Sequence, residues 1–388
     1  MHAHSRFIAK PQPPPRLSVI VVLYDMEREA GRSLHSLSAR YQQGIAEADY
    51  EVVVVDNGSP RPFRGGSVAE LGANFSYHYL PKVGVSPAAA LNHGARAARA
   101  DYLALMIDGA RIVTPGLLRH GLLLRALFDD PCGYTHGWHL GPDLQCRSIE
   151  SGYDREREDA LLAGIAWPRD GYRLFEIAAL HGEMDGWFGR YFESNCTFVR
   201  RDTFFALGGA DERFRTAGGG LVNLDLQYRI TEHPSVTPVM ILGEGTFHQL
   251  HGGATSSTPW SALAGRLDEF TREYRELRGT EFSWRLPDRP LQYFGHVPAS
   301  AAHWLEHSAR QVQPELERLN ETTRWLHLEV RQRDETVVWL HREVASRDAT
   351  VAWLHAEVAQ RDALVEELRR QIAAASLEAI GGSSRETS

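Results

Sequence analysis

The feature that most restricts the fold is a repeat near the C-terminal end of the sequence. Trp-Leu-His occurs at 325–327, again at 339–341 and again at 353–355, each time followed by Glu-Val and then by Arg-Asp. No proline or glycine lies between Glu315 and Ile380. Since proline and glycine are the residues that most often interrupt helices, this stretch predicts one long helix.

The repeat is two heptads long and places apolar residues along one face of that helix. Valine occupies most a positions of the heptad, whereas leucine at d alternates with Arg333, Arg347 and Arg361. This pattern predicts a coiled coil over 316–376, through which the chain forms a homo-oligomer. A lone helix is the alternative, but it would leave the apolar seam in water. The arginines leave the number of strands undecided.

Runs of β-branched residues alternate with helical patterns in the first part of the chain. The predicted strands are 17–24, 50–59 (ending in an acidic turn) and 102–107, and the predicted helices are 27–41 and 87–100. This order is typical of a doubly wound α/β sheet, in which ligands bind beyond the carboxyl ends of the strands. Tyr24, Asp56 and Asp108 lie at those ends.

The segment 132–190 has little periodicity and is rich in aromatic residues, glycine and histidine. We expect long loops and short helices there, forming one wall of a cleft. A further strand is expected at 236–242, leading toward His248 and His251.

Composition narrows the functional classes. The net charge of −8 argues against nucleic acid as a partner, because phosphate binding needs a surplus of Lys and Arg. The three cysteines match neither a disulfide framework nor a zinc pattern, which indicates a reducing cytoplasm. The N-terminal residues lack a signal peptide's apolar stretch, and no run approaches the ~20 apolar residues of a membrane helix. We expect a cytoplasmic protein, with peripheral attachment to the inner face of the membrane as an open alternative.

Several motifs between 17 and 258 occur in an order and spacing that resembles glycosyltransferase family 2, the inverting enzymes with the GT-A fold. The motifs are Ser18–Val22, Val53–Ser59, Ala90–Gly94, Leu105–Asp108, Asn195, Phe198–Arg201, Leu207–Phe214 and Asp225–Arg229. The resemblance implies a GT-A (nucleotide-diphospho-sugar transferase) sheet followed by the coiled coil. The expected segments are a disordered leader at 1–16, the GT-A domain at 17–285, a linker at 286–315, the coiled coil at 316–376 and a disordered tail at 377–388.

The resemblance assigns nucleotide-binding roles to several positions. Asp56 would accept a hydrogen bond from the nucleotide base, and an Asx turn in which it only holds its own loop is the alternative. Tyr24 and Asn92 would line the same pocket, with simple packing as their alternative. Asp108 would face the diphosphate.

The resemblance also implies a divalent cation, Mn²⁺ or Mg²⁺, on the diphosphate. Asp108 matches the first carboxylate of the family's Asp-x-Asp motif, but the second position is Ala110. His248 and His251 are candidates to complete the metal site, and a structural pair of hydrogen-bonded histidines is the alternative.

The catalytic base departs further from the family pattern. Inverting transfer needs a carboxylate to take the proton of the acceptor hydroxyl. The family's Glu-Asp pair is Val222-Asn223 here, and neither residue can act as a base. Asp225 is the candidate that remains at this segment, and Glu193 and Asp211 are other nearby carboxylates.

The sequence therefore predicts a glycosyltransferase that moves a sugar from a nucleotide-diphospho-sugar to an acceptor hydroxyl with inversion. The acceptor would be a glycan or glycolipid, in surface glycan or polysaccharide synthesis. The losses at Ala110 and Asn223 leave an alternative. In that alternative the domain is a catalytically degenerate nucleotide-sugar-binding scaffold that works through its coiled coil.

Overall fold

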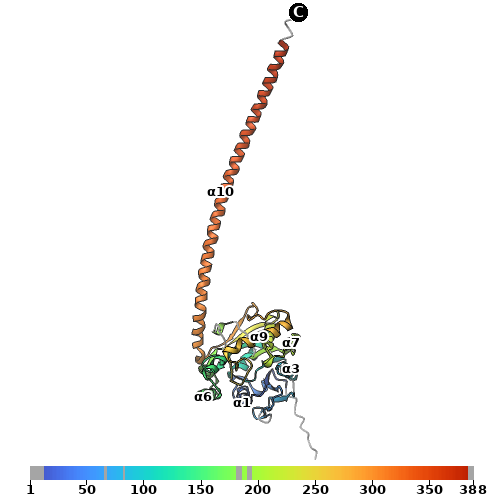
Figure 1. Cartoon of the computed structure of the whole chain (residues 1–388), viewed down its shortest axis with the longest axis vertical. Coiled ribbons are helices and arrows are strands. Elements are labelled where there is room, and N and C mark those ends of the chain that lie inside the picture. The colour runs from blue at the N-terminus through green and yellow to red at the C-terminus, as the bar shows by residue number, and fades with distance from the viewer. Residues whose placement is uncertain (1–12, 65–67, 82–83, 181–185, 190–194, 383–388) are drawn as a thin grey trace, which may run out of the picture. The chain divides into compact units, whose positions relative to one another are not determined.

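The computed structural model describes residues 13–64, 68–81, 84–180, 186–189 and 195–382. The chain separates into two compact units, Met1–Val312 and Gln313–Ser388. The first unit is mixed α/β around a large sheet, and the second consists of most of one long helix (Figure 1). An α/β fold followed by a long C-terminal helix is therefore confirmed.

The strands of the described residues form one ten-stranded sheet with the order β10-β9-β6-β8-β4-β1-β2-β3, while β5 pairs with β9 and β7 with β6. The strands are β1 (Leu17–Leu23), β2 (Tyr50–Asp56), β3 (Phe75–Tyr79), β4 (Tyr102–Met106), β5 (Arg111–Val113), β6 (Pro131–Leu140), β7 (Ala178–Leu180), β8 (Asn195–Arg200), β9 (Thr237–His248) and β10 (Gln292–Gly295). Strand β1 is parallel to both β2 and β4, whereas β8 is antiparallel to β4.

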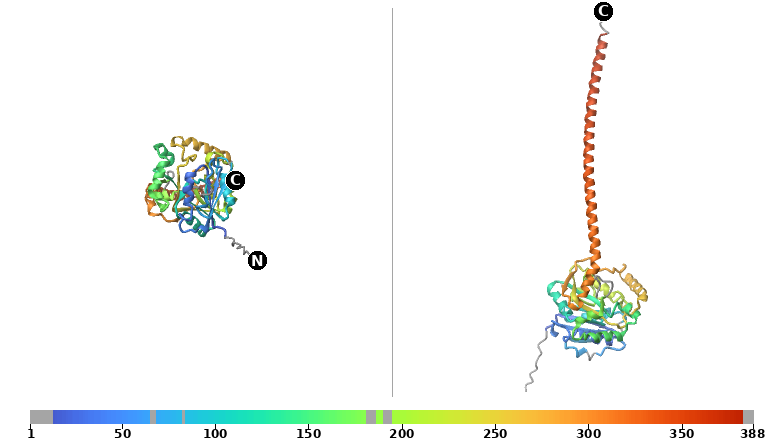
Figure 2. Two further views of the ribbon diagram at one scale, coloured as in Figure 1. Left: turned by 90° about the horizontal axis from the view of Figure 1, so that it is seen from below. Right: turned by 90° about the vertical axis from the view of Figure 1, so that its left-hand side faces the viewer.

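Helices cover the sheet of the first unit, and one helix continues into the second unit (Figures 1 and 2). They are α1 (Glu27–Ser36), α3 (Ala88–Ala97), α4 (Leu117–Leu127), α5 (Gln145–Ser148), α6 (Arg155–Ile165), α7 (Arg201–Ala206), α8 (Val222–Glu232), α9 (Trp260–Arg278) and α10 (His303–Gly382). Short 3-10 turns lie at Glu47–Asp49, Ile149–Ser151, Gly171–Ile177, Gly186–Phe188, Ala217–Gly219 and Ala299–Ala301. No helix in the described part of the chain is both long and apolar enough to cross a bilayer.

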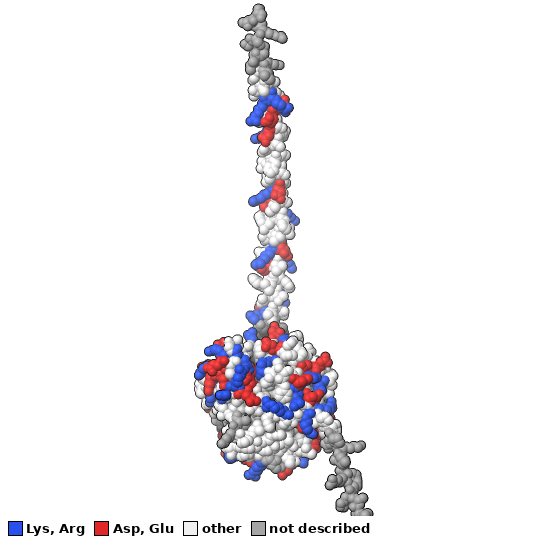
Figure 3. Space-filling model, turned by 90° about the vertical axis from the view of Figure 1, so that its right-hand side faces the viewer, with Lys and Arg blue, Asp and Glu red and all other residues white. Residues whose placement is uncertain are grey.

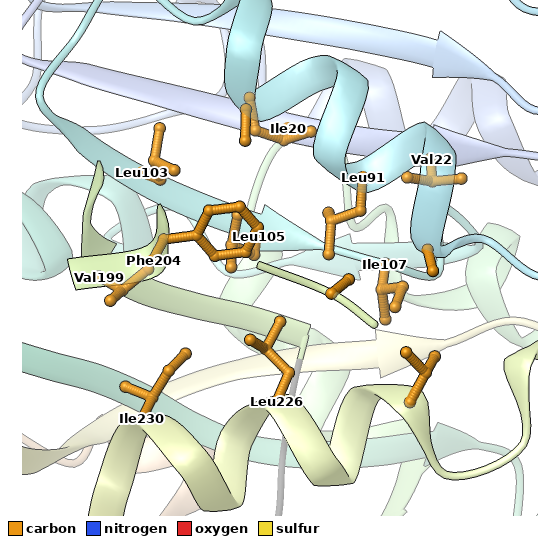
Figure 4. Packing of buried hydrophobic residues seen from close by; sticks show 14 of the residues in the cluster. Ile20, Val22, Leu91, Leu103, Leu105, Ile107, Val199, Phe204, Leu226 and Ile230 are labelled. Carbon is orange, nitrogen blue, oxygen red and sulfur yellow. The ribbon is translucent and has the colours of Figure 1, made fainter. Parts of the chain in front are cut away.

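The β-branched runs form the centre of the sheet because both of their faces are buried. Ile20 and Val22 of β1 face one side, where Leu91 of α3 and Leu226 and Ile230 of α8 pack (Figure 4). The alternate β1 residues face the other side of the sheet, toward α1 and α4. Burying each such aliphatic side chain contributes about 1.5–3 kcal/mol. This two-sided burial explains why the runs contain no polar alternation.

The expectation of loops at 132–190 is wrong at its beginning. Residues Pro131–Leu140 form β6, a fully buried strand parallel to β9. Its sequence mixes glycine, threonine and histidine with aromatic residues, so neither strand alternation nor an aliphatic run marks it. His136 and Thr135 are fully buried there.

The segment 286–315, expected to be a linker, contributes to both units. Strand β10 lies within it and is parallel to β9, and α10 begins at His303. At the other end α10 reaches Gly382, inside the expected tail. Most of the expected leader and the final residues 383–388 lie outside the described residues.

Candidate functional site

A cleft of about 580 Å³ opens at the carboxyl ends of β1 and β4. Tyr24 and Asp25 follow β1 into it, and Ile107 and Asp108 follow β4. These strands are parallel neighbours, so their ends meet at one edge of the sheet. Residues from 217–223, from 248–256 and from α9 form much of the opposite wall, and Asn57, Val85, Pro87, Arg111, His139 and Asn195 are among the other lining residues.

Asp108 is fixed by hydrogen bonds to both its backbone and its side chain. Its N–H donates to Oδ1 of Asn195 over 2.9 Å, and its Oδ1 accepts from the N–H of Ala110 over 3.0 Å. The carboxylate is 23% exposed, whereas Ala110 is fully buried in the apolar core. A carboxylate at position 110 would face apolar side chains, so this fold offers no second ligand there.

The two histidines expected to complete the site lie beside Asp108. His248 is the last residue of β9, and its Nε2 lies 3.0 Å from Oδ2 of Asp108. His251 Nε2 lies 3.7 Å from Oδ1 of Asp108 and 3.2 Å from Nε2 of His248. The ligand atoms of the three side chains all lie within 4.8 Å of one another. A single cation can contact all three groups.

Gln145 of α5 sets the orientation of His248. Its Nε2 donates to the backbone carbonyl of His248 over 2.9 Å, which fixes the amide so that Oε1 faces the ring. Oε1 lies 2.5 Å from Nδ1 of His248, so Nδ1 carries the proton and donates it. The Nε2 lone pair of a neutral His248 therefore points toward Asp108. This is the arrangement in which a histidine binds a metal.

The local electrostatics keep both groups in their ligand forms. Burial works to raise the pKa of Asp108, but His251, His248 and Arg111 outweigh it and hold that pKa well below its usual range. Burial lowers the pKa of His248 to about 4, against the attraction of Asp108. The Asp108 carboxylate and the His248 imidazole thus face each other across 3.0 Å, and a cation can bind to both.

The segment that carries both histidines is held by side chains from α1 and α6. Fully buried Glu158 accepts from the N–H of Leu250 over 2.8 Å, and Arg28 donates to the carbonyl of Leu250 over 3.4 Å. Arg155 donates to the carbonyl of His251 over 3.3 Å. Because the backbone is held on both sides, the ligand positions are set by the fold.

The family comparison supports the interpretation of these motifs. Residues 18–116 match the model of Glycosyl transferase family 2. The match confirms the resemblance to that family over this segment and, with the mixed α/β sheet, the GT-A class of fold.

Several solved structures are similar to part of this chain at low sequence identity. S. aureus TarS is 14% identical over 61% of this chain and 37% of the TarS chain, with a TM-score of 0.40. TarS 1-349 in complex with UDP-GlcNAc is 13% identical over 67% of this chain and 66% of that chain, with a TM-score of 0.42. GalNAc-T7 with UDP, GalNAc and Mn²⁺ is 14% identical over 68% and 49%, with a TM-score of 0.40. A search of curated proteins gave no match.

Asp56 lies beneath the cleft surface. It is fully buried at the end of β2, where Oδ1 accepts from the N–H of Ser59, and Oδ2 accepts from the N–H of Phe63 and from the Tyr77 hydroxyl. These contacts correspond to the Asx-turn alternative and hold the loop after β2. The cleft is lined by the following residue, Asn57.

Asn57 is a candidate that the sequence analysis missed. Its side-chain Nδ2 donates to the carbonyls of Gly84 and Ser86, which turns Oδ1 the other way. Oδ1 has no hydrogen-bond partner among the residues that the structure describes. Strand alternation could have indicated Asn57. Successive side chains along a strand point to opposite faces, and Asn57 directly follows Asp56, the last residue of β2.

Tyr24 and Asn92, expected in one pocket, are separated. Tyr24 lines the cleft and is 49% exposed. Asn92 is buried on α3, where its amide group bonds the backbone of Ala210 in both directions and the side chain of Glu212. The pocket that includes Asn92 is a different one, so packing explains this residue.

Asp225 cannot serve as the base in this arrangement. Its carboxylate is 1% exposed and pairs with Nε of Arg229 at 2.9 Å and with Nε of Arg278 at 2.7 Å. It lies outside the cleft lining, whereas Asn223 is part of that lining. The expectation for Asp225 is therefore wrong, and its role is to tie α8 to α9. Asp211 also pairs with Arg278 and Arg213, and Glu193 lies outside the described residues.

Proposed function

We propose that this chain is a glycosyltransferase that transfers a sugar from a nucleotide-diphospho-sugar to an acceptor hydroxyl with inversion. The acceptor would be a glycan or glycolipid, in surface glycan or polysaccharide synthesis. The observation that carries the proposal is the convergence of Asp108, His248 and His251 in a cleft at the carboxyl edge of a family 2 sheet.

The donor set fits a divalent cation. Asp108 offers a carboxylate oxygen, His248 offers an Nε2 lone pair oriented by Gln145, and His251 offers a second imidazole nitrogen. Two nitrogen ligands favour a transition-metal ion such as Mn²⁺ over Mg²⁺, which prefers oxygen ligands. When bound, the ion would neutralise negative charge on the departing diphosphate.

The nucleoside would occupy the part of the cleft next to Tyr24 and Asn57. The exposed Tyr24 ring can stack on a base. We assign to Asn57 the role that the family resemblance gave to Asp56. Its Oδ1 would accept a hydrogen bond from an imide N–H, while Asp56 holds the loop that carries it.

A specific observation favours the second candidate, a nucleotide-sugar-binding module without turnover. Among the described residues, Asp25 and Asp108 are the carboxylates that line the cleft. Asp25 pairs with Arg61 at 3.1 Å, and Asp108 belongs to the proposed metal site. Asn223 stands in the cleft where the family carries a base. In this second candidate, nucleotide-sugar binding would serve an assembly that forms through α10.

Calorimetry and turnover together separate the two candidates. The full chain is titrated with a panel of nucleotide-diphospho-sugars with and without Mn²⁺, and released nucleoside diphosphate is then measured with glycan acceptors. We expect Mn²⁺-dependent binding and release, with an inverted anomeric centre in the product by NMR. Metal-dependent binding without release from any donor would favour the binding module.

The variant Asp108→Asn locates the activity. We expect it to lose metal-dependent binding and turnover, because the amide removes the anionic ligand. His93→Ala is the matched control, since His93 forms a similar histidine pair with His78 at 3.3 Å outside this cleft. Normal turnover in Asp108→Asn would reject the proposed metal role.

A further inference from the structure

Helix α10 carries an apolar seam that its own chain leaves exposed within the described residues. Val330 is 54% exposed, Leu340 is 47% exposed and Val358 is 55% exposed. The seam consists of Leu326, Val330, Val337, Leu340, Val344, Val351, Leu354, Val358, Val365, Leu368 and Ile372. Leaving such a continuous stripe in water is unfavourable, so a partner surface is needed.

We propose that a second copy of this chain covers the seam as a parallel, in-register, two-stranded coiled coil. The inference goes beyond the transferase function and does not rest on it. It specifies a second copy of the chain as the partner, a parallel orientation and two strands.

The aliphatic residues favour two parallel strands. Every a position from Val330 to Val365 is valine, and the apolar d positions are Leu326, Leu340, Leu354 and Leu368. β-Branched residues at a combined with leucine at d favour a parallel dimer over higher oligomers.

The charged d positions favour the same arrangement. Arg333 pairs with Glu329 of its own helix at 3.2 Å, and the same pair recurs as Arg347–Glu343 at 3.1 Å and Arg361–Glu357 at 3.2 Å. The charged groups form bands separated by uncharged stretches along α10 (Figure 3). Each arginine thus keeps its remaining guanidinium donors for a second acceptor.

That second acceptor is the aspartate at the following e position. Asp334, Asp348 and Asp362 each follow one of these arginines, and the described helix gives them no ion pair. In a parallel in-register pair, a d side chain packs beside the e residue of the other copy. Arg333 then reaches Asp334 of the second copy and lies between that carboxylate and Glu329. An antiparallel pair would instead set each arginine against a valine.

The tryptophans of the repeat lie beside this seam, at the c position. Trp325, Trp339 and Trp353 are 60%, 61% and 63% exposed. A two-stranded coil buries a and d and leaves c in water, so the proposed pair leaves these rings exposed.

Cysteine cross-linking in the full chain tests direction and register. Leu326→Cys and Leu368→Cys, at opposite ends of the seam, are made separately and oxidised; the native cysteines are buried. We expect each variant to form a disulfide with itself and to show the mass of two chains by light scattering. Ala349→Cys on the outer f position is the control and should stay unlinked.

Other cross-linking results overturn the proposal. A two-chain mass without a disulfide in either variant would show that the pair is not parallel and in register, because an antiparallel pair sets each d position against an a position. A monomer mass would remove the partner, and a trimer or tetramer mass would reject two strands.

A charge variant tests the interstrand pairs. Replacing Asp334, Asp348 and Asp362 together by alanine should raise the dimer dissociation constant about three- to tenfold, because exposed ion pairs contribute modestly. Glu335→Ala, on the outer face, should leave it unchanged. An unchanged constant in the triple variant would reject the Arg–Asp contacts and leave the cross-linking result to decide the direction.

Discussion

Two carboxylates that match family motifs, Asp108 and Asp225, have opposite surroundings. Asp108 is partly exposed in the cleft and faces two imidazoles, whereas Asp225 is 1% exposed and faces two guanidinium groups. The charge of Asp225 is neutralised by the chain itself. The oxygens of Asp108 lie against the imidazole nitrogens of His248 and His251, with Nε of Arg111 at 3.7 Å, and the three side chains Asp108, His248 and His251 can share a cation.

A residue that matches a family motif can be assigned a role only when its contacts in the folded protein are known. A carboxylate already paired with arginines stabilises the fold, and one that converges with other ligands can bind something further. The same distinction separates Asp56, which holds its own loop, from Asn57, whose Oδ1 has no partner among the described residues.

The largest expected effect is on stability. Asp225→Asn leaves Arg229 without its carboxylate and Arg278 with Asp211 alone, and should lower the free energy of unfolding by about 3 kcal/mol, allowing for the partial exposure of both arginines. Asp108→Asn should change it by less than about 1 kcal/mol, because that carboxylate has only one backbone donor to lose. Urea denaturation of both variants measures the free energy of unfolding. Equal decreases in the two variants would contradict a structural role for Asp225 that Asp108 lacks.

The next largest effect is expected on the metal site, from a change in a residue that is not itself a proposed ligand. Gln145→Leu removes the groups that orient His248, and should raise the dissociation constant for Mn²⁺ about 10- to 100-fold. Gln42→Leu is the control, because Gln42 is equally buried and donates to the carbonyls of Ser36 and Thr114 instead. Equal Mn²⁺ affinities in the two variants would show that Gln145 has no positioning role.

A smaller effect concerns the nucleoside. Asn57→Leu should weaken binding of a uridine nucleotide about three- to tenfold, the value of one neutral hydrogen bond. Binding of the metal should stay the same. Asn57→Asp keeps an acceptor and should retain more affinity than the leucine variant. Isothermal titration calorimetry of the parent and the two variants measures these affinities. Identical affinities would show that Asn57 does not bind the nucleoside, and Tyr24 would be left as its proposed contact.

A third carboxylate, Glu244, extends the comparison to pH. Glu244 is fully buried and lies 3.1 Å from Nδ1 of His120. Burial lowers the pKa of His120, but the hydrogen bond and charge of Glu244 outweigh it and raise that pKa. The stabilisation that the His120–Glu244 pair gives to the folded state is therefore complete below about pH 6.5, the pKa of His120 in the unfolded chain. It is lost as pH rises through the raised pKa of His120 in the folded chain. Stability measured across this range should fall in the parent and fall less in His120→Asn.

The sequence predicted those parts of the molecule that follow from local pattern. The aliphatic strands β1, β2 and β4 have both faces buried, and α10 has a regular repeat, so both were recognisable. Strand β6 was missed because its buried polar residues find partners only in the folded sheet. Thr135, for example, donates to carbonyls of Ile241 and Glu244 more than 100 positions away.

The site was predictable only where the family motifs reach. Asp108, His248 and His251 were expected together and do meet. Gln145 carries no signal, since a single glutamine in an unpatterned segment gains its role only through the position of α5. The roles of Asp56 and Asn92 stayed open between binding and packing, and that of Asp225 between base and structure, because burial and partners decide them and neither can be read from the motif.

The most direct test of the account is the coordination of Mn²⁺ in the full chain by pulsed electron paramagnetic resonance. The account predicts one Mn²⁺ per chain with nitrogen couplings from imidazole, weakened in His248→Ala and lost with the bound ion in Asp108→Asn. Bound Mn²⁺ without nitrogen couplings, or affinity unchanged in Asp108→Asn, would contradict it.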